Sequence, residues 1–283
     1  MVKVSRSNPF PHLVKLLDDP SPVVQEEVRK ALLAMAGEIG QCLKIFPVTG
    51  AQRQALNKML SGWLRTQILA RWPAWNNGQP KQSLEKAHEL LGNFALGWLP
   101  EQTLAEKLDG LAQRCRESDP SLTLESLPPL LSQWLQGERE NYYDPANSLL
   151  SQVLDQGHGN PISLCCILIL GGERLGLDYW GVNYPGHFLA RFETPEGPRF
   201  VDCFGHGAVL LPELTPELRG TLANSELQGI LAQPVQTEHI VQRVLRNLVA
   251  TSLQSGNRSH ANLYDLLLKD MVARAQEIGR AHV

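Results

Sequence analysis

The stretch GNPISLCCILILGGERLGL, residues 159–177, predicts a buried helix with a well-defined start, and the fold is expected to form around this helix. Asn160 is a good N-cap, and Pro161 suits the first helical position, where no backbone N–H needs a partner. The residues that follow are apolar on every side, which is typical of a helix enclosed by other elements. We therefore expect a buried helix from Pro161 to about residue 175.

Two adjacent cysteines, Cys165 and Cys166, lie inside this apolar run. A buried cysteine behaves as a small hydrophobic residue with a raised pKa, so we interpret both as packing residues. The alternative, that one of them is a nucleophile, stays open at this point. The other cysteines are scattered and form no CxxC pair, so the sequence indicates neither a disulfide framework nor a zinc site.

The composition is that of an ordinary globular protein, with 43% hydrophobic and 19% charged residues in 283. The net charge of −3 argues against a general nucleic-acid footprint. No apolar run reaches the roughly 18 residues that span a bilayer, and no signal region follows the first residues. We expect a cytoplasmic protein without a membrane or nucleic-acid partner, without a cofactor and without a metal.

Helical periodicity dominates the chain up to residue 121, where ESDPS marks a candidate domain boundary. Near the start, DDPSP separates two apolar helical stretches, with Ser21 as N-cap and Pro22 at the first helical position. A helix pair with an Asp-Pro turn resembles a HEAT-type repeat, and a plain helical hairpin is equally compatible. We predict a helical, HEAT-like region over residues 1–121.

Residues 122–236 combine helices with three strand-like runs, YWGVNYP, GHFLARFE and RFVDCFG. The last two runs are joined by TPEGP, whose Pro and Gly suit a hairpin loop. A helix followed by an antiparallel sheet predicts an α+β core.

Residues 237–276 return to helix, in two amphipathic segments around the turn SGN, and resemble one tetratricopeptide-like helix pair. The final heptapeptide EIGRAHV, residues 277–283, does not continue the apolar pattern. IGRAHV can be back-translated to ATCGGAAGAGCACACGTC, the start of a common sequencing-adapter oligonucleotide. We expect these residues to be adapter read-through and leave them out of the fold prediction.

The motifs YYDPANSLL, GNPISL, RLGL, GVNYPGHFLARF and VDCFGHG resemble the SirB1 family, which carries the transglutaminase-like core domain type 2. The resemblance covers residues 138–215 in detail. It implies a transglutaminase-like, papain-like core of one helix and an antiparallel sheet, with helices before and after it.

In the wider superfamily a cysteine opens the helix, and a histidine and an aspartate follow on successive strands. The resemblance places the histidine at His187 and the aspartate at Asp202, whereas the cysteine position falls on Pro161. Proline carries no nucleophile, and Cys165 lies one turn, about 5.4 Å, deeper in the helix. His187 and Asp202 are then remnants that hold the sheet together or line a remnant cleft.

Two functions follow from these observations. The first is a catalytically inactive transglutaminase-like protein that serves as a protein-interaction or regulatory module with protein partners. The second is a thiol-dependent peptidase or acyl transferase that uses Cys165 or Cys166 with His187 and Asp202.

Overall fold

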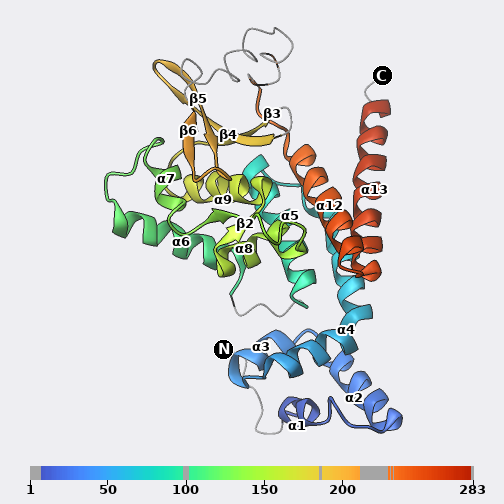
Figure 1. Cartoon of the computed structure of the whole chain (residues 1–283). Coiled ribbons are helices and arrows are strands. Elements are labelled where there is room, and N and C mark those ends of the chain that lie inside the picture. Colours follow the sequence, from blue (N-terminus) through green and yellow to red (C-terminus); the bar gives the residue numbers. More distant parts are fainter. Residues whose placement is uncertain are drawn as a thin grey trace. The chain divides into compact units, whose positions relative to one another are not determined.

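The computed structural model describes residues 8–97, 102–184, 187–210, 229, 231 and 233–281. The chain divides into two compact units, one of residues 1–73 with 93–102 and one of residues 74–92 with 103–283 (Figure 1). The second unit carries the β-sheet and the predicted site residues.

Helices make up the first unit. They are α1 (Phe10–Lys15), α2 (Pro22–Ala34), α3 (Ile39–Ile45) and α4 (Gly50–Arg71), followed by the short 3-10 helix η1 (Trp72–Ala74). Helix α2 begins at Pro22 with Ser21 in an extended N-cap conformation, as predicted, although the Ser21 side chain makes no capping hydrogen bond. Leu32, Leu56 and Leu60 are fully buried and contribute to the core of this unit. The HEAT-like character of the region stays a prediction.

Helix α9 (Pro161–Arg174) is the central element of the second unit and begins at the predicted residue. It lies between the main sheet and a layer that contains α6 (Leu104–Ser118) and α8 (Leu150–Gln156) (Figure 1). Most of α5 (Pro80–Ala95), α7 (Leu127–Leu131) and the 3-10 helix η2 (Pro145–Ser148) complete this part. Eleven consecutive residues of α9, from Ile162 to Gly172, are buried, which explains why its sequence is apolar on every side.

The main sheet is antiparallel in the order β3-β4-β5-β6. Its strands are β3 (Trp180–Tyr184), β4 (His187–Thr194), β5 (Gly197–Asp202) and β6 (Ala208–Leu210). The β4–β5 hairpin turns within TPEGP, as predicted, and pairs Thr194 with Gly197. A separate parallel pair, β1 (Gln136–Gly137) with β2 (His158–Gly159), was not predicted from the sequence.

The two faces of this sheet pack against different partners. Phe188, Ala190 and Phe192 of β4 are buried on the face toward α9. On the other face, Leu189 forms a separate apolar cluster whose further buried members are Val182, Phe200 and Leu231. Adjacent residues along β4 therefore belong to two cores, because side chains alternate across a strand.

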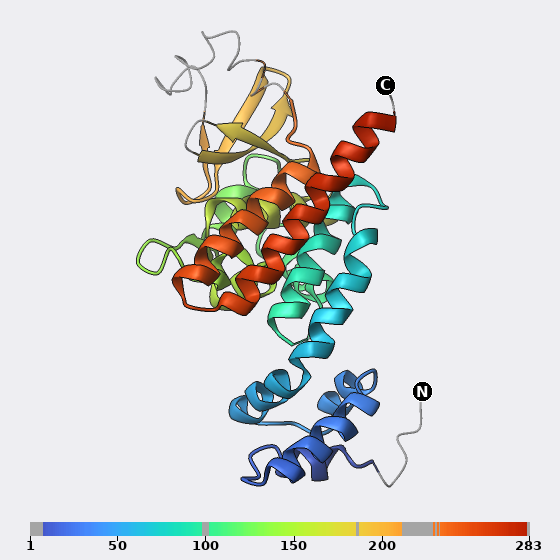
Figure 2. The same cartoon turned by 90° about the vertical axis from the view of Figure 1, so that its right-hand side faces the viewer.

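Helices α12 (Thr237–Gln254) and α13 (Arg258–Ala281) follow the sheet and lie side by side (Figure 2). The fold is α+β with helical segments at both ends, as predicted. The tetratricopeptide-like character of the pair, the domain boundaries at 121, 236 and 276, and the adapter origin of residues 277–283 stay predictions. Among the helices of the described residues, none combines the length and the apolar character that a membrane span requires.

Two adjacent glycines in α9 give a test of its packing. A Cβ at Gly172 would lie 2.6 Å from the ring of Tyr179 and 2.9 Å from the Leu177 carbonyl oxygen, whereas a Cβ at Gly171 would meet only Leu111 at 3.9 Å. We predict that Gly172→Ala lowers the free energy of unfolding by about 2 kcal/mol through overpacking. Gly171→Ala should raise it by up to about 1 kcal/mol because alanine favours helix. Urea denaturation measures the free energy of unfolding of both variants. Equal changes in the two variants would contradict the packing of α9 described here.

His88 of α5 gives a prediction for pH dependence. Its ring is buried, and neither ring nitrogen has a hydrogen-bond partner among the described residues. Burial lowers the pKa of His88 to about 3. The unfolded chain therefore binds a proton near pH 6.5 that the folded chain rejects. Stability from this group is fully present above pH 6.5 and is lost as the pH falls toward the folded pKa.

We predict that the free energy of unfolding of His88→Leu falls less than that of the wild type between pH 7 and pH 4. The wild type should lose on the order of 3 kcal/mol more than the variant over this range. The free energy of unfolding, measured by urea denaturation at each pH, tests this, and parallel pH profiles would contradict it.

Candidate functional site

The site is built around the N-terminus of α9, where Asn160 acts as the cap. Asn160 Oδ1 accepts hydrogen bonds from the backbone N–H groups of Ile162 at 3.0 Å and Ser163 at 2.9 Å. The Asn160 N–H donates in return to Ser163 Oγ at 3.0 Å, which completes a capping box. Pro161 occupies the first helical position, as predicted. The tip of the helix is thus closed by its own side chains.

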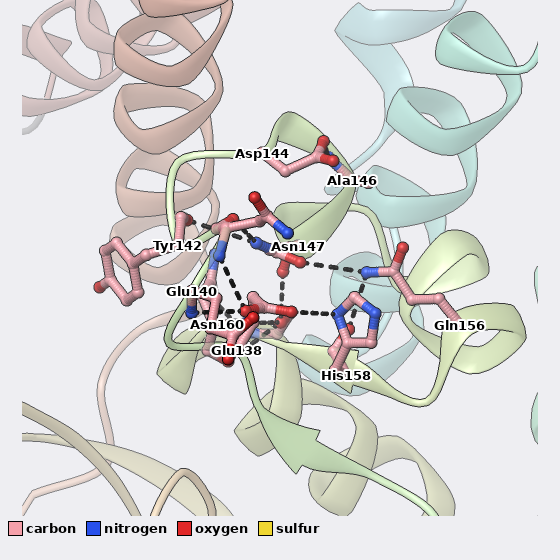
Figure 3. A network of polar contacts seen from close by, with 11 residues as sticks. Glu138, Glu140, Tyr142, Asp144, Ala146, Asn147, Gln156, His158 and Asn160 are labelled. Carbon is pink, nitrogen blue, oxygen red and sulfur yellow. Dashed lines mark hydrogen bonds and ion pairs between the residues drawn. The ribbon is translucent and has the colours of Figure 1, made fainter.

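Asn147 of η2 ties this helix tip to the preceding loop (Figure 3). Its buried side chain donates to the Asn141 carbonyl at 2.8 Å and accepts from Gln156 Nε2 at 3.1 Å. Its backbone carbonyl accepts from Ser163 Oγ at 2.6 Å and from the Asn160 N–H at 3.1 Å. One residue therefore fixes the loop, α8 and the start of α9 relative to each other.

Glu138 and His158 form the outer part of the same network (Figure 3). Glu138 Oε1 accepts the backbone N–H groups of Glu140 at 2.7 Å and Asn141 at 2.9 Å. Hydrogen bonds from the loop backbone, that of Asn141 above all, lower the pKa of Glu138. Its Oε2 lies 3.0 Å from His158 Nδ1, but this nitrogen makes no aligned hydrogen bond. The contact is an ion pair only when His158 is protonated.

The two candidate thiols lie deeper in α9 and are inaccessible. Cys165 and Cys166 are both 0% exposed, and Cys165 Sγ lies 3.6 Å from the Phe188 carbonyl oxygen. Burial, and then the neighbouring Cys203 thiol, raises the pKa of Cys165 well above its usual value. Burial likewise raises the pKa of Cys166. Both groups are therefore thiols rather than thiolates at neutral pH.

His187 and Asp202 lie on adjacent antiparallel strands, as the sequence predicted. The register pairs Arg191 with Phe200, so alternation places His187 and Asp202 on one face of the sheet. This is the face of the Leu189 cluster, opposite to the face that packs on α9. The register places both residues on the face opposite to α9, but Asp202 still lies close enough to Cys165 to contribute to the raised pKa of that thiol.

Each of these two side chains has its own surroundings. The exposed ring of His187 lies 5.9 Å from the ring of Tyr184. The Asp202 carboxylate accepts the backbone N–H groups of Phe204 at 3.1 Å and Gly205 at 2.9 Å, which shapes the turn after β5. No hydrogen bond or ion pair joins His187 to Asp202 within the described ranges. A functional role for the pair stays a prediction.

A small pocket lies between α7, α9 and the turn after β5, and Leu131, Leu164, Leu168 and Cys203 are among the residues that line it. About 20 Å³ of it is open to the centre of a water molecule, which is room for roughly one water and too little for a substrate. Among the residues that the structure describes, no group of three or more His, Cys, Asp or Glu side chains is arranged to hold a metal ion.

Sequence reasoning found part of this network and missed the rest. It identified Asn160 as the cap of α9 with Pro161 at the first helical position, and the structure has both. It missed Glu138 and Gln156, whose role depends on the pairing of β1 with β2. The only local signal was the density of polar residues in the stretch ENYYDPANS.

Residues 102–246, about half of the chain, match the family model of the transglutaminase-like superfamily. The chain belongs to this superfamily. No solved structure matches it significantly.

The chain is also similar to several curated proteins. A "UPF0162 protein" of Xylella fastidiosa (strain 9a5c) is 38% identical over 117 residues, which cover 40% of this chain and 42% of the relative. A "UPF0162 protein" of Pseudomonas aeruginosa is 26% identical over 189 residues, which cover 66% of this chain and 61% of the relative. Human "F-box only protein 21" is 30% identical over 140 residues, which cover 46% of this chain and 22% of that protein. The chain thus matches less than two thirds of the length of these relatives.

The cap of α9 gives a test of the network. We predict that Asn160→Ala lowers the free energy of unfolding by about 2 kcal/mol, because it removes the cap and leaves buried partners unsatisfied. Asn160→Ser keeps a capping hydroxyl but loses the 2.8 Å hydrogen bond from Asn160 Nδ2 to Ser148 Oγ, so it should cost about 1 kcal/mol. Chemical denaturation measures both variants. An unchanged free energy of unfolding in Asn160→Ala would show that the helix tip is not closed as described.

Proposed function

We propose that this protein is a catalytically inactive transglutaminase-like protein of the SirB1 type that acts in the cytoplasm by binding protein partners. One observation carries the proposal: Pro161 stands at the helix tip, where the resemblance expects the nucleophile, and the thiols of α9 are buried. Proline contributes to the start of the helix and offers no atom that attacks a carbonyl.

The arrangement of the remaining groups supports inactivity. A thiol nucleophile needs a base within hydrogen-bond reach and a thiolate that substrate can approach. The environment of Cys165 keeps it protonated, and its Sγ is directed at a backbone carbonyl of β4. All five cysteines of the chain are buried, so no other thiol takes over the role. Burial of the thiols therefore supports the proposed inactivity over the thiol-enzyme alternative.

Exposed aromatic side chains on a well-held loop support a binding role. Tyr142 is 42% exposed and Tyr143 58%, and their rings meet edge to face at 5.4 Å. Glu138 and Asn147 hold the backbone of this loop from within. Tyrosine offers a large contact area at a low entropic cost when its backbone is already ordered, and it is enriched at protein interfaces.

The C-terminal helix pair offers a second exposed apolar area. Leu253 of α12 and Leu266 and Val272 of α13 are exposed. Helix pairs of repeat type present such faces to neighbouring repeats or to partners. This supports the interaction role without identifying the partner.

Alkylation of the native protein tests the absence of a reactive thiol. We predict that iodoacetamide at pH 7.5 labels Cys165 and Cys166 on the order of 100-fold more slowly in the folded protein than in the urea-unfolded protein, because only the opened chain presents a thiolate. Mass spectrometry of tryptic peptides measures the rate at each site.

The matched control is His187→Ala, which should leave both rates unchanged. Rapid labelling of either cysteine in the folded wild type, lost in His187→Ala, would overturn the proposed inactivity and establish the thiol-enzyme alternative.

A further inference from the structure

Arg243 of α12 reaches the sheet and is held there from two sides. Its Nη1 donates to Asn183 Oδ1 of β3 at 2.5 Å. Its guanidinium carbon lies 5.1 Å from the centre of the Phe188 ring of β4, in a cation–π contact. The side chain is half-buried. These contacts fix the plane of the guanidinium group and use only one of its five N–H donors.

The positive charge of Arg243 has no counter-ion in the part of the chain that the structure describes. The half-buried Arg174 contrasts with it, because it contacts Glu85 at 2.9 Å and Asp109 at 2.6 Å. The ionisable groups that act on Arg243 are a guanidinium, a phenol and a thiol, those of Arg246, Tyr142 and Cys165. Burial, and then the like charge of Arg246, lowers the pKa of Arg243. A partly desolvated cation without an anion is an unfavourable arrangement that a bound anion would relieve.

The loop that carries Tyr142 and Tyr143, here called the aromatic loop, borders this cation. Tyr142 is close enough to Arg243 to raise the pKa of the guanidinium group. The Tyr142 ring points away from the polar network (Figure 3). The Tyr142 ring also meets the Phe204 ring at 6.3 Å, edge to face. A fixed cation beside exposed aromatic rings is a common arrangement for binding an acidic group carried on a larger ligand.

We propose that Arg243 binds a carboxylate of a protein partner, with Tyr142 at the rim of the site. The N–H donors of the guanidinium that no described residue accepts match the two oxygens of a carboxylate in bidentate geometry. The proposal rests on the binding role proposed above and names the chemical group of the partner that is bound. It places recognition between α12, β3 and the aromatic loop.

NMR spectroscopy of the arginine Nε–Hε groups tests the site on the whole protein, with sodium acetate as the carboxylate probe. The Arg243 signal is assigned as the one that Arg243→Lys removes. We expect acetate to shift this signal saturably, with a dissociation constant in the millimolar range, whereas sodium chloride at equal ionic strength does not. Arg246 lies one turn further along α12 and is exposed, so Arg246→Lys is the matched control and should change acetate affinity less than twofold.

A second variant tests the site without removing the arginine. Asn183→Asp is nearly isosteric and places a carboxylate on Arg243, so it should weaken acetate binding at least about tenfold by supplying the counter-ion from within. Thermal denaturation confirms that each variant is folded. Unchanged acetate affinity in Asn183→Asp, or equal shifts by acetate and chloride in the wild type, would overturn the proposal.

Sodium phosphate forms the third arm of the experiment. Saturation by phosphate but not by acetate would overturn the carboxylate assignment in favour of a phosphoryl group. None of these outcomes depends on thiol reactivity, so failure of the site and failure of the proposed inactivity are distinguishable.

Discussion

The closed N-terminus of α9 is the constraint on which the rest of this core depends. A helix that is buried along its length must find hydrogen-bond partners for its first N–H groups inside the protein. Asn160 and Ser163 supply them, and Asn147 carries the same network into the preceding loop. The loop, the β1–β2 pair and η2 are therefore positioned by the need to satisfy one helix tip.

The same arrangement separates structural from chemical roles in α9. Pro161 favours the start of the helix, because its fixed φ fits and no donor is lost. One turn deeper, the low polarity that stabilises the helix also keeps Cys165 protonated. Favourable packing and a reactive thiol have opposite requirements at this position, and the structure meets the first of them.

Alternation along β4 divides the sheet between two environments. Phe188 faces α9 and supports the guanidinium of Arg243, whereas His187 and Leu189 belong to the opposite face. The face toward α9 carries the half-buried cation of Arg243, and this supports the binding role that we propose.

The sequence by itself determined the features that rest on local physics. The start of α9 at Pro161, the burial of Cys165 and Cys166 and the turn within TPEGP follow from a cap, an apolar run and turn residues close together in the chain. The polar network, the face that His187 occupies and the contact of Arg243 with Asn183 across 60 residues were decided only by the tertiary structure. These features depend on strand register and on which distant elements meet, and neither leaves a periodic signal in a single sequence.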